Sequence, residues 1–120
     1  MVKDLTRILQ SHLFDATSLQ ESRSWQPFRP GIEISPLYDT GTGASAAFLK
    51  YQPGASVPLH EHSGWEHILV LAGSQSDDTN HYAAGTLVIH APGSRHRVTS
   101  EEGCLVLAIW EQPVRFPESS

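Results

Sequence analysis

The chain has 120 residues, enough for one domain with a hydrophobic core and too few for two domains of normal size. A net charge of −5 with only 8 Lys and Arg argues against nucleic-acid partners and against attraction to anionic membranes, both of which need clustered basic side chains. The single cysteine cannot form an internal disulfide, the N-terminus lacks the apolar run of a signal peptide, and no stretch approaches the ~20 apolar residues that span a bilayer, so we expect a cytoplasmic protein.

The first segment, residues 1–27, predicts a short N-terminal helix or arm. Asp4 is placed to cap a first helical turn. Apolar residues then recur at helical spacing, at Leu5, Ile8, Leu9 and Leu13. This pattern predicts an amphipathic helix over residues 4–13, and the alternative is an arm that packs on a partner subunit.

From Gly31 onward, apolar runs of about five to eight residues alternate with turn residues, which is typical of an all-β sandwich or barrel. The predicted strands are "GIEISPLY", "ASAAFLKY", "EHILVLAG", "GTLVIHA", "HRVTS" and "CLVLAIWE". The predicted turns are "DTGTG", "QPGAS", "SQSDDTN", "APGS" and "SEEG", where Gly, Pro, Asp and Asn favour bends. We therefore assign residues 28–113 to one β-barrel and residues 114–120 to a C-terminal tail.

Two of the predicted strands, "ILVLA" and "CLVLAIW", are apolar at consecutive positions instead of alternating. A strand of this kind has no solvated face, so its outer side must be covered by another sheet or by another subunit. We therefore expect a homodimer.

A cluster of metal-ligand side chains lies at the ends of the predicted strands. Side chains two residues apart in an extended strand project from the same face, so His60 and His62 can converge on one ion. A tight reversal at Gly64 brings in Glu66, and the later turn "APGSRH" brings in His96. Burying these groups would be costly unless an ion bound them. Three neutral imidazoles and one carboxylate suit zinc, iron(II), manganese or nickel better than calcium or magnesium.

The remaining histidines and one acidic residue give weaker signals. His67 follows Glu66 directly and should point to the opposite face of the strand, where a packing or surface role is expected. His90 either supports the metal site or is an ordinary residue at a strand end. We assign no function to the bystanders Glu61, His12 and His81.

Aromatic residues and the cysteine are expected to belong to the core. Tyr51, Trp65 and Trp110 can line a cavity, but in a barrel of this size such residues more often pack in the interior. Cys104 follows two acidic residues that would raise its pKa, so an inert core thiol is expected.

The metal-ligand cluster lies inside two longer motifs that resemble those of the cupins. The first cupin motif is matched at every fixed position, namely Gly54, His60, His62, Glu66 and Gly73. The second is matched at Gly85, Gly93 and His96. Ala91 stands where that motif has proline, and Ser100 stands where it often ends in asparagine. The resemblance implies a small jelly-roll β-barrel, and the two departures affect the turn and leave the ligand in place.

Within the cupins, about residues 28–110 resemble the cupin domain of ChrR-type anti-sigma factors, through "FRPGIEISPLYDTG", "PGASVPLHEHSGWEHILVLAGSQSDD", "HYAAGTLVIHAPGSRH" and "SEEGCLVLAIW". This resemblance implies one divalent metal ion, zinc in the anti-sigma case, held by His60, His62, Glu66 and His96. Those factors bind sigma through a separate zinc domain built from His and Cys, whereas residues 1–27 contain no cysteine. We therefore expect a cupin module without the sigma-binding zinc domain.

Two functions are compatible with such a site. A tetrahedral zinc with four protein ligands indicates a structural or sensory site, in which a small-molecule ligand or an oxidant alters a surface read by a partner. Octahedral iron, manganese or nickel leaves two positions for substrate. The alternative is therefore a small metal-dependent enzyme, such as a dioxygenase acting on a β-diketone or a flavonol-like compound.

Overall fold

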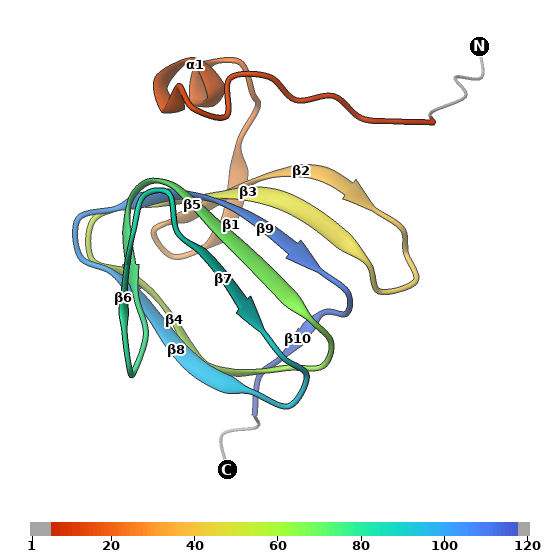
Figure 1. Ribbon diagram of the computed structural model, residues 1–120, viewed down its shortest axis with the longest axis vertical. Coiled ribbons are helices and arrows are strands. Elements are labelled where there is room, and N and C mark those ends of the chain that lie inside the picture. Colours follow the sequence, from red (N-terminus) through yellow and green to blue (C-terminus); the bar gives the residue numbers. More distant parts are fainter. Residues whose placement is uncertain (1–5, 118–120) are drawn as a thin grey trace.

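The computed structural model describes residues 6–117, which form a sheet of antiparallel strands curled into a half-barrel, with one short helix beside it (Figure 1). This confirms the predicted all-β, cupin-like class. No helix within residues 6–117 is long and apolar enough to cross a membrane. The elements in chain order are α1 (Ala16–Glu21), β1 (Gln26–Arg29), β2 (Ile32–Asp39), β3 (Ser45–Tyr51), β4 (Ala55–His62), β5 (Glu66–Ser76), β6 (His81–Ala83), β7 (Leu87–His90), β8 (Arg95–Ser100), β9 (Cys104–Trp110) and β10 (Val114–Arg115).

The strands follow the order β1-β2-β3-β9-β5-β8-β4-β10, and both β6 and β7 pair with β5. The long strand β5 makes the sheet curl, because its two halves have different neighbours. Its first half, Glu66 to Leu69, pairs with β7 and β9, whereas its last residues, Ser74 to Ser76, pair with β6 and reach β8. The half-barrel therefore has an interior that both groups of strands face.

The interior core is apolar and comes from alternate residues of the central strands. Ile68 and Val70 of β5 pack with Val106 and Ala108 of β9, and all four are at most 6% exposed. Alternation places the next residues on the outer face of the sheet, since side chains in a strand point to opposite sides in turn.

Helix α1 covers part of this outer face. Asp15 begins the helix by accepting a hydrogen bond from the backbone N–H of Ser18, 3.1 Å away. Leu19 is fully buried against Phe48 of β3 and Leu105 of β9. The outer face of the two apolar strands is expected to be covered by another sheet or subunit. The chain's own N-terminal segment supplies part of this cover.

The helix predicted over residues 4–13 is wrong. Residues 6–12 are not helical, the helix begins at Ala16, and residues 4 and 5 lie outside the described part of the chain. Ile8 and Leu9 are 50% and 80% exposed, so the apolar periodicity that suggested the helix has no surface to pack on. A short helix in water is marginal without such packing.

Several strands were not predicted from the sequence, and two predicted turns are partly strand. β4 begins at Ala55 inside "QPGAS", and β5 continues to Ser76 inside "SQSDDTN". Strand β4 is absent from the predicted strands, and so are the short strands β1, β6 and β10; β1 pairs with β2, and β10 pairs with β4. The three short strands are two to four residues long, too short for a period-2 pattern to appear.

Candidate metal centre

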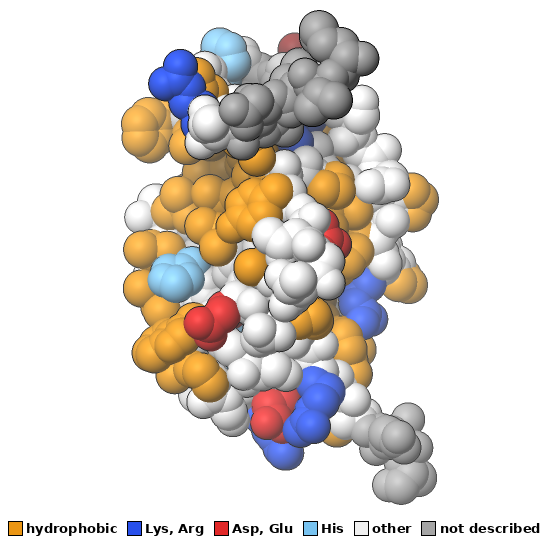
Figure 2. Space-filling model, turned by 90° about the vertical axis from the view of Figure 1, so that its right-hand side faces the viewer, with side chains coloured by type: hydrophobic (Ala, Val, Ile, Leu, Met, Phe, Trp, Pro, Cys, Tyr) orange, Lys and Arg blue, Asp and Glu red, His pale blue; other side chains and the backbone are white. Residues whose placement is uncertain are grey.

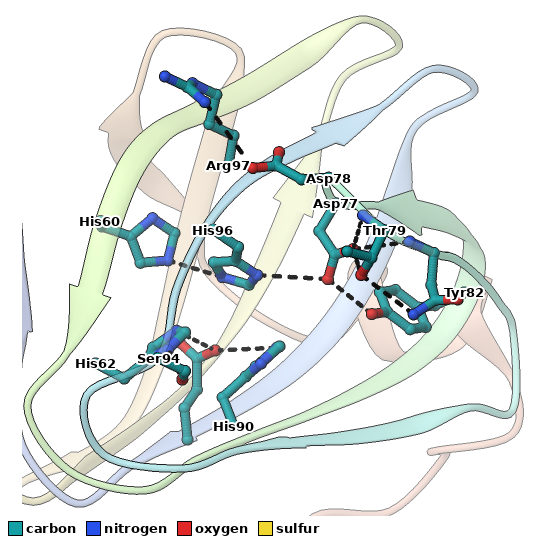
Figure 3. A network of polar contacts seen from close by, with 12 residues as sticks. His60, His62, Asp77, Asp78, Thr79, Tyr82, His90, Ser94, His96 and Arg97 are labelled. Atoms are coloured by element: carbon teal, nitrogen blue, oxygen red, sulfur yellow. Dashed lines mark hydrogen bonds and ion pairs between the residues drawn. The ribbon is translucent and has the colours of Figure 1, made fainter.

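The structure brings the four predicted ligand residues together. His60 and His62 come from β4 and His96 from β8 (Figure 3). Glu66 is the first residue of β5. One nitrogen from each of the three histidines lies within 4.8 Å of the others. The Glu66 Oε1 atom lies 3.0 Å from His62 Nε2. All four side chains are buried, with residue exposures between 1% and 7%.

A β-bulge in β4 turns the two histidines inward. Val57 and His60 are three residues apart, yet their partners on β8, Val98 and His96, are only two apart. The extra residue of β4 falls next to Pro58, which has no N–H to donate to a ladder and is tolerated at a bulge. The shift places His60 on the same inner face as Val57 and directly opposite His96.

The hydrogen bonds of the first two histidines fix which ring nitrogen carries the proton. The Nδ1–H of His60 donates to the carbonyl of Pro58, 2.9 Å away. The Ser94 hydroxyl donates to the carbonyl of Ala91 at 2.6 Å, so it accepts from the Nδ1–H of His62 at 2.9 Å. Both rings therefore direct an unprotonated Nε2 into the cluster, which is the form that ligates a metal.

Glu66 and its neighbours leave acceptor atoms without donors. The indole N–H of Trp110 donates to Glu66 Oε2 at 2.8 Å, which leaves Oε1 directed at His62 Nε2. Among the described residues, the buried atoms His62 Nε2, Glu66 Oε1 and His96 Nδ1 have no hydrogen-bond partner. The Nε2 atoms of His60 and His96 face each other at 3.0 Å. Converging lone pairs of this kind are costly in a buried site and fit a cation between them.

The protonation states match a metal-binding site. Burial lowers the pKa of His60, and it lowers the pKa of His96 to about 4 with help from the nearby His60 and His90. Burial raises the pKa of Glu66, but its close contact with His62 and the hydrogen bond from the Trp110 N–H outweigh this and hold its pKa below the usual value. At neutral pH His60 and His96 are therefore neutral and Glu66 is ionised, as metal ligands must be.

His90 lies much closer to the cluster than the sequence indicated. Its ring stacks on His62 with centroids 4.7 Å apart and an interplanar angle of 13°, and its Nε2 lies 3.9 Å from Glu66 Oε1. Together with Glu66 and His96, it forms a second group of possible ligand atoms within 4.8 Å of one another. The pairing of β7 with β5 explains this, because it places His90 opposite Glu66.

Asp77 also belongs to the site, and the sequence analysis missed it. Its Oδ2 lies 3.6 Å from His96 Nδ1 and accepts a hydrogen bond from the Tyr82 hydroxyl at 2.7 Å. Burial raises the pKa of Asp77, but hydrogen bonds from Tyr82 and from the backbone of Thr79 and Asn80 hold it well below its usual range. An ionised carboxylate therefore faces the outer nitrogen of His96 (Figure 3).

A cavity of about 500 Å³ opens beside the cluster. His60, Glu66 and His96 form part of its wall, so a molecule in the cavity can reach the candidate metal ligands. The remaining wall is mostly apolar, as in many small-molecule sites. It includes Phe28, Leu49, Tyr51, Val57, Ile68, Val98, Trp110, Val114 and Phe116.

Comparison with known proteins assigns the family. Residues 15–113 match the family described as the ChrR cupin-like domain. The chain belongs to this family. It is 35% identical over 98 residues to the anti-sigma-E factor ChrR of Cereibacter sphaeroides, an alignment that covers 80% of this chain and 46% of ChrR. This ChrR cupin-like domain thus spans about half the length of its curated relative.

Solved structures agree with the assignment. The crystal structure of Rhodobacter sphaeroides SigE in complex with the anti-sigma ChrR contains a chain that is 33% identical, with a TM-score of 0.67 and coverage of 75% of this chain and 50% of that one. Two more distant structures share the fold. One is an RmlC-like cupin from Ralstonia eutropha, with 22% identity, a TM-score of 0.70 and coverage of 78% of this chain and 66% of that one. The other is an acetylacetone dioxygenase from Acinetobacter johnsonii, with 16% identity, a TM-score of 0.75 and coverage of 99% of this chain and 84% of that one.

The other polar residues, to which no function was assigned from the sequence, point away from the candidate metal centre of this ChrR-like cupin. His67 is on the outer face of the sheet, paired across the strands with Ile89 and Ile109. Glu61 forms ion pairs of 3.2 Å with both Arg95 and Arg115. The two remaining histidines, His12 and His81, are exposed.

The aromatic residues and the cysteine divide between cavity, core and surface. Tyr51 is buried, and Tyr51 and Trp110 line the cavity of this ChrR-like cupin. The expectation that Trp65 is a core residue is wrong, because Trp65 is 47% exposed at the turn before β5. Cys104 is a buried thiol whose pKa is raised to about 11, mainly by burial, as expected for an inert core residue.

Proposed function

We propose that this chain is a metal-binding cupin that acts as a sensory or ligand-binding module. In this proposal His60, His62, Glu66 and His96 hold one divalent metal ion, with zinc as the first candidate. The observation that supports it is that His62 Nε2 and Glu66 Oε1 are buried without hydrogen-bond partners among the described residues, while the Nε2 atoms of His60 and His96 face each other at 3.0 Å. Nitrogen and carboxylate ligands in this ratio favour zinc and its transition-metal neighbours over calcium or magnesium.

The sensory role rests on the cavity beside the proposed ion. A small molecule or an oxidant that enters it meets His60 and His96, whose strands β4 and β8 are paired with each other. A change at the ligands can therefore pass along the β4–β8 pair toward the surface. The relative ChrR is described as an anti-sigma factor, and we propose a regulatory partner for this module as well.

A small metal-dependent enzyme, such as a dioxygenase acting on a β-diketone or flavonol-like compound, is the second candidate. The size and apolar lining of the cavity favour it, since an organic substrate fits beside the candidate ligands. A bound iron, manganese or nickel ion with open positions would polarise oxygen atoms of the substrate. The chain would exclude water with its apolar wall, and Asp77 would hold the proton on His96 Nδ1.

Elemental analysis separates the two functions. The protein is purified without a His tag, and its metal content is measured before and after treatment with a chelator. One equivalent of zinc per chain, with no turnover of acetylacetone or a flavonol, is the result expected for the sensory module. Iron, manganese or nickel together with turnover would establish the enzyme instead, and a preparation that is stable and competent without any ion would refute both.

Alanine variants test the ligand assignment. We expect His60→Ala, His62→Ala and His96→Ala each to reduce the bound metal sharply, because each removes a buried nitrogen that faces the cluster. His67→Ala is the matched control, since His67 lies on the outer face of the same sheet. Equal metal loss in all four variants would show that the ligand set is wrong.

We also propose that the chain forms a homodimer through the outer face of the sheet that α1 leaves open. Leu87, Ile89 and Ile109 are exposed there by 55%, 50% and 38%. Strand β7, which carries two of these residues, pairs only with β5 within residues 6–117. An unpaired apolar edge of this kind is suited to pairing with a second copy of itself.

A further inference from the structure

We propose that the cavity binds an organic anion, with a carboxylate held by Arg29 at the mouth and an apolar body in the interior. This inference rests on the proposed function, because it names the class of ligand that would occupy the same site. It assigns Arg29 as the residue that selects for negative charge.

Arg29 is a cation of the cavity wall without a counter-ion. It is the last residue of β1, and a bulge between Pro27 and Arg29 interrupts the pairing of β1 with β2. Such bulges re-aim side chains next to functional sites. The Arg29 side chain is half-buried, and no hydrogen bond or ion pair joins it to any other part of residues 6–117. Its guanidinium lies instead over the Phe116 ring, 4.0 Å from the centroid.

Three other arginines of the barrel are paired, which makes Arg29 distinctive. Arg95 and Arg115 each lie 3.2 Å from Glu61, and Arg97 lies 3.9 Å from Asp78. Those three side chains are 59% to 71% exposed, so water already solvates their charges. A half-buried cation is less solvated and gains more from an anionic partner. A guanidinium held beside an apolar cavity, with its five N–H donors unused, is suited to a carboxylate.

The charged residues of the cavity wall determine which end of a bound ligand lies at the mouth. Among the described lining residues, Glu66 is the only carboxylate and Arg29 the only arginine or lysine. Phe116 contacts the Arg29 guanidinium on one side and approaches the His60 ring on the other, with centroids 5.6 Å apart. Exposed Phe28 and Pro30 flank Arg29 and place it at the mouth. The guanidinium of Arg29 therefore attracts a carboxylate to the mouth of the cavity.

The interior wall suits an apolar body. Leu49, Val57, Ile68 and Val98 line the cavity and are all at least 91% buried. A volume of about 500 Å³ accommodates a chain of roughly eight carbons, since small-molecule sites of this size hold larger ligands. Transfer of each methylene group from water to such a wall strengthens binding by about fourfold. We therefore expect longer alkanoates to bind more tightly than acetate.

Calorimetric titration of the purified full chain with octanoate tests the inference. The neutral octanamide has the same apolar body and serves as the ligand control. We expect octanoate to bind more tightly than octanamide, and Arg29→Gln to weaken octanoate by at least about tenfold, the value of a charge-assisted hydrogen bond. The same variant should leave octanamide binding and metal content unchanged. Arg97→Gln is the matched control and should change neither affinity.

Three other outcomes overturn the inference, and a fourth separates it from the proposed function. Equal affinity of the unmodified chain for octanoate and octanamide would show that charge is not selected. Octanoate binding that survives in Arg29→Gln but disappears with chelator would place the carboxylate at the ion; it would refute the role of Arg29 and support the metal site. Arg29-dependent binding in a chain that holds no metal would support the inference while the proposed function fails. No binding of any alkanoate at millimolar concentration refutes the ligand class.

Discussion

The two oxygens of Glu66 have different surroundings, and Trp110 causes the difference. Its indole N–H satisfies Oε2 at 2.8 Å, while Oε1 is buried without a donor among residues 6–117. The carboxylate is thereby held in one orientation, with its free oxygen next to His62 Nε2. Residues that orient ligand side chains in this way affect metal affinity almost as strongly as the ligands themselves.

Trp110→Phe should weaken metal binding by about tenfold or more, because it removes the N–H that orients Glu66 while keeping an aromatic ring in the cavity wall. The affinity is measured by competition with a chromogenic chelator. Trp65→Phe is the control, since that side chain is 47% exposed and its indole makes no contact with the site. Unchanged affinity in Trp110→Phe would show that the Trp110 N–H does not orient Glu66 for metal binding.

The pKa of His96 predicts how the metal-free chain responds to acid. In the folded chain this pKa is about 4, against an ordinary value of 6.5, so the unfolded chain binds the extra proton first. The contribution of His96 to the free energy of unfolding is therefore fully present above pH 6.5. It is lost as the pH falls toward 4, by up to about 3 kcal/mol. Asp77 and Glu66 have lowered pKa values and add to the loss only at the acidic end of this range.

Urea denaturation of the chelated chain between pH 7.5 and 4.5 measures this loss. The free energy of unfolding should fall across the range, and His96→Asn should reduce the slope. Added zinc should restore stability at the upper end, because bound metal stabilises the folded state. A stability that does not change down to pH 4.5 would show that His96 is protonated as easily in the folded chain as in the unfolded one.

At the scale of the strands, the barrel depends on close contacts that only glycine permits. Gly73 in β5 has a φ of +72°, and a Cβ placed there would lie 2.0 Å from the carbonyl oxygen of Gly103. The contact joins β5 to the start of β9 at the end of the core. A side chain at this position would separate these two strands.

Gly73→Ala should therefore destabilise the chain by about 3 kcal/mol or more, from backbone strain at positive φ together with the overlap. Gly85→Ala is a matched control, because Gly85 has a φ of +91° but open space around its Cβ position. It should cost about 1 to 2 kcal/mol, the strain alone. Urea denaturation compares the two variants, and equal losses would show that the contact with Gly103 relaxes freely.

The strands were predictable where hydrophobic patterning is strong. "EHILVLAG" and "CLVLAIWE" are central strands, and their apolar side chains fill both faces of the sheet. The helix was misplaced because Ala16–Glu21 has a single buried residue, Leu19, and so shows no periodicity. What marks its start is the cap by Asp15, a local signal that the more regular spacing of residues 5–13 concealed.

The proposed ligands could be identified from spacing, but their supporting residues could not. His60 and His62 share a face in any extended strand, and the motif adds Glu66 and His96. The positions of His90 and Asp77 depend on how β6 and β7 fold back onto β5, which the order of residues does not specify. Arg29 likewise acquires its place through a bulge in a four-residue strand.

At the scale of the whole molecule, the outer surface is divided between a covered and an open part. The N-terminal segment covers Phe48 and Leu105, and Arg23 fastens it to β2 by donating to the Ser35 hydroxyl at 2.7 Å and the Pro36 carbonyl at 2.8 Å. Leu87, Ile89 and Ile109 are exposed on the open part. Figure 2 shows hydrophobic side chains widespread on one face of the molecule, with acidic and basic side chains scattered between them. Exposed apolar area of this kind marks an interaction site.

If two copies meet there, a charge at the centre of the open face should separate them. Ile89 lies on β7, which pairs on one side only, with β5, within residues 6–117, and it is 50% exposed. Ile89→Lys should convert a dimer into a monomer in sedimentation equilibrium, because the interface would bury two unpaired ammonium groups related by the two-fold axis. Thr99→Lys, at an exposed position of β8, should leave the dimer intact. Unchanged metal content would show that both variants fold, and a monomeric unmodified chain would refute the dimer.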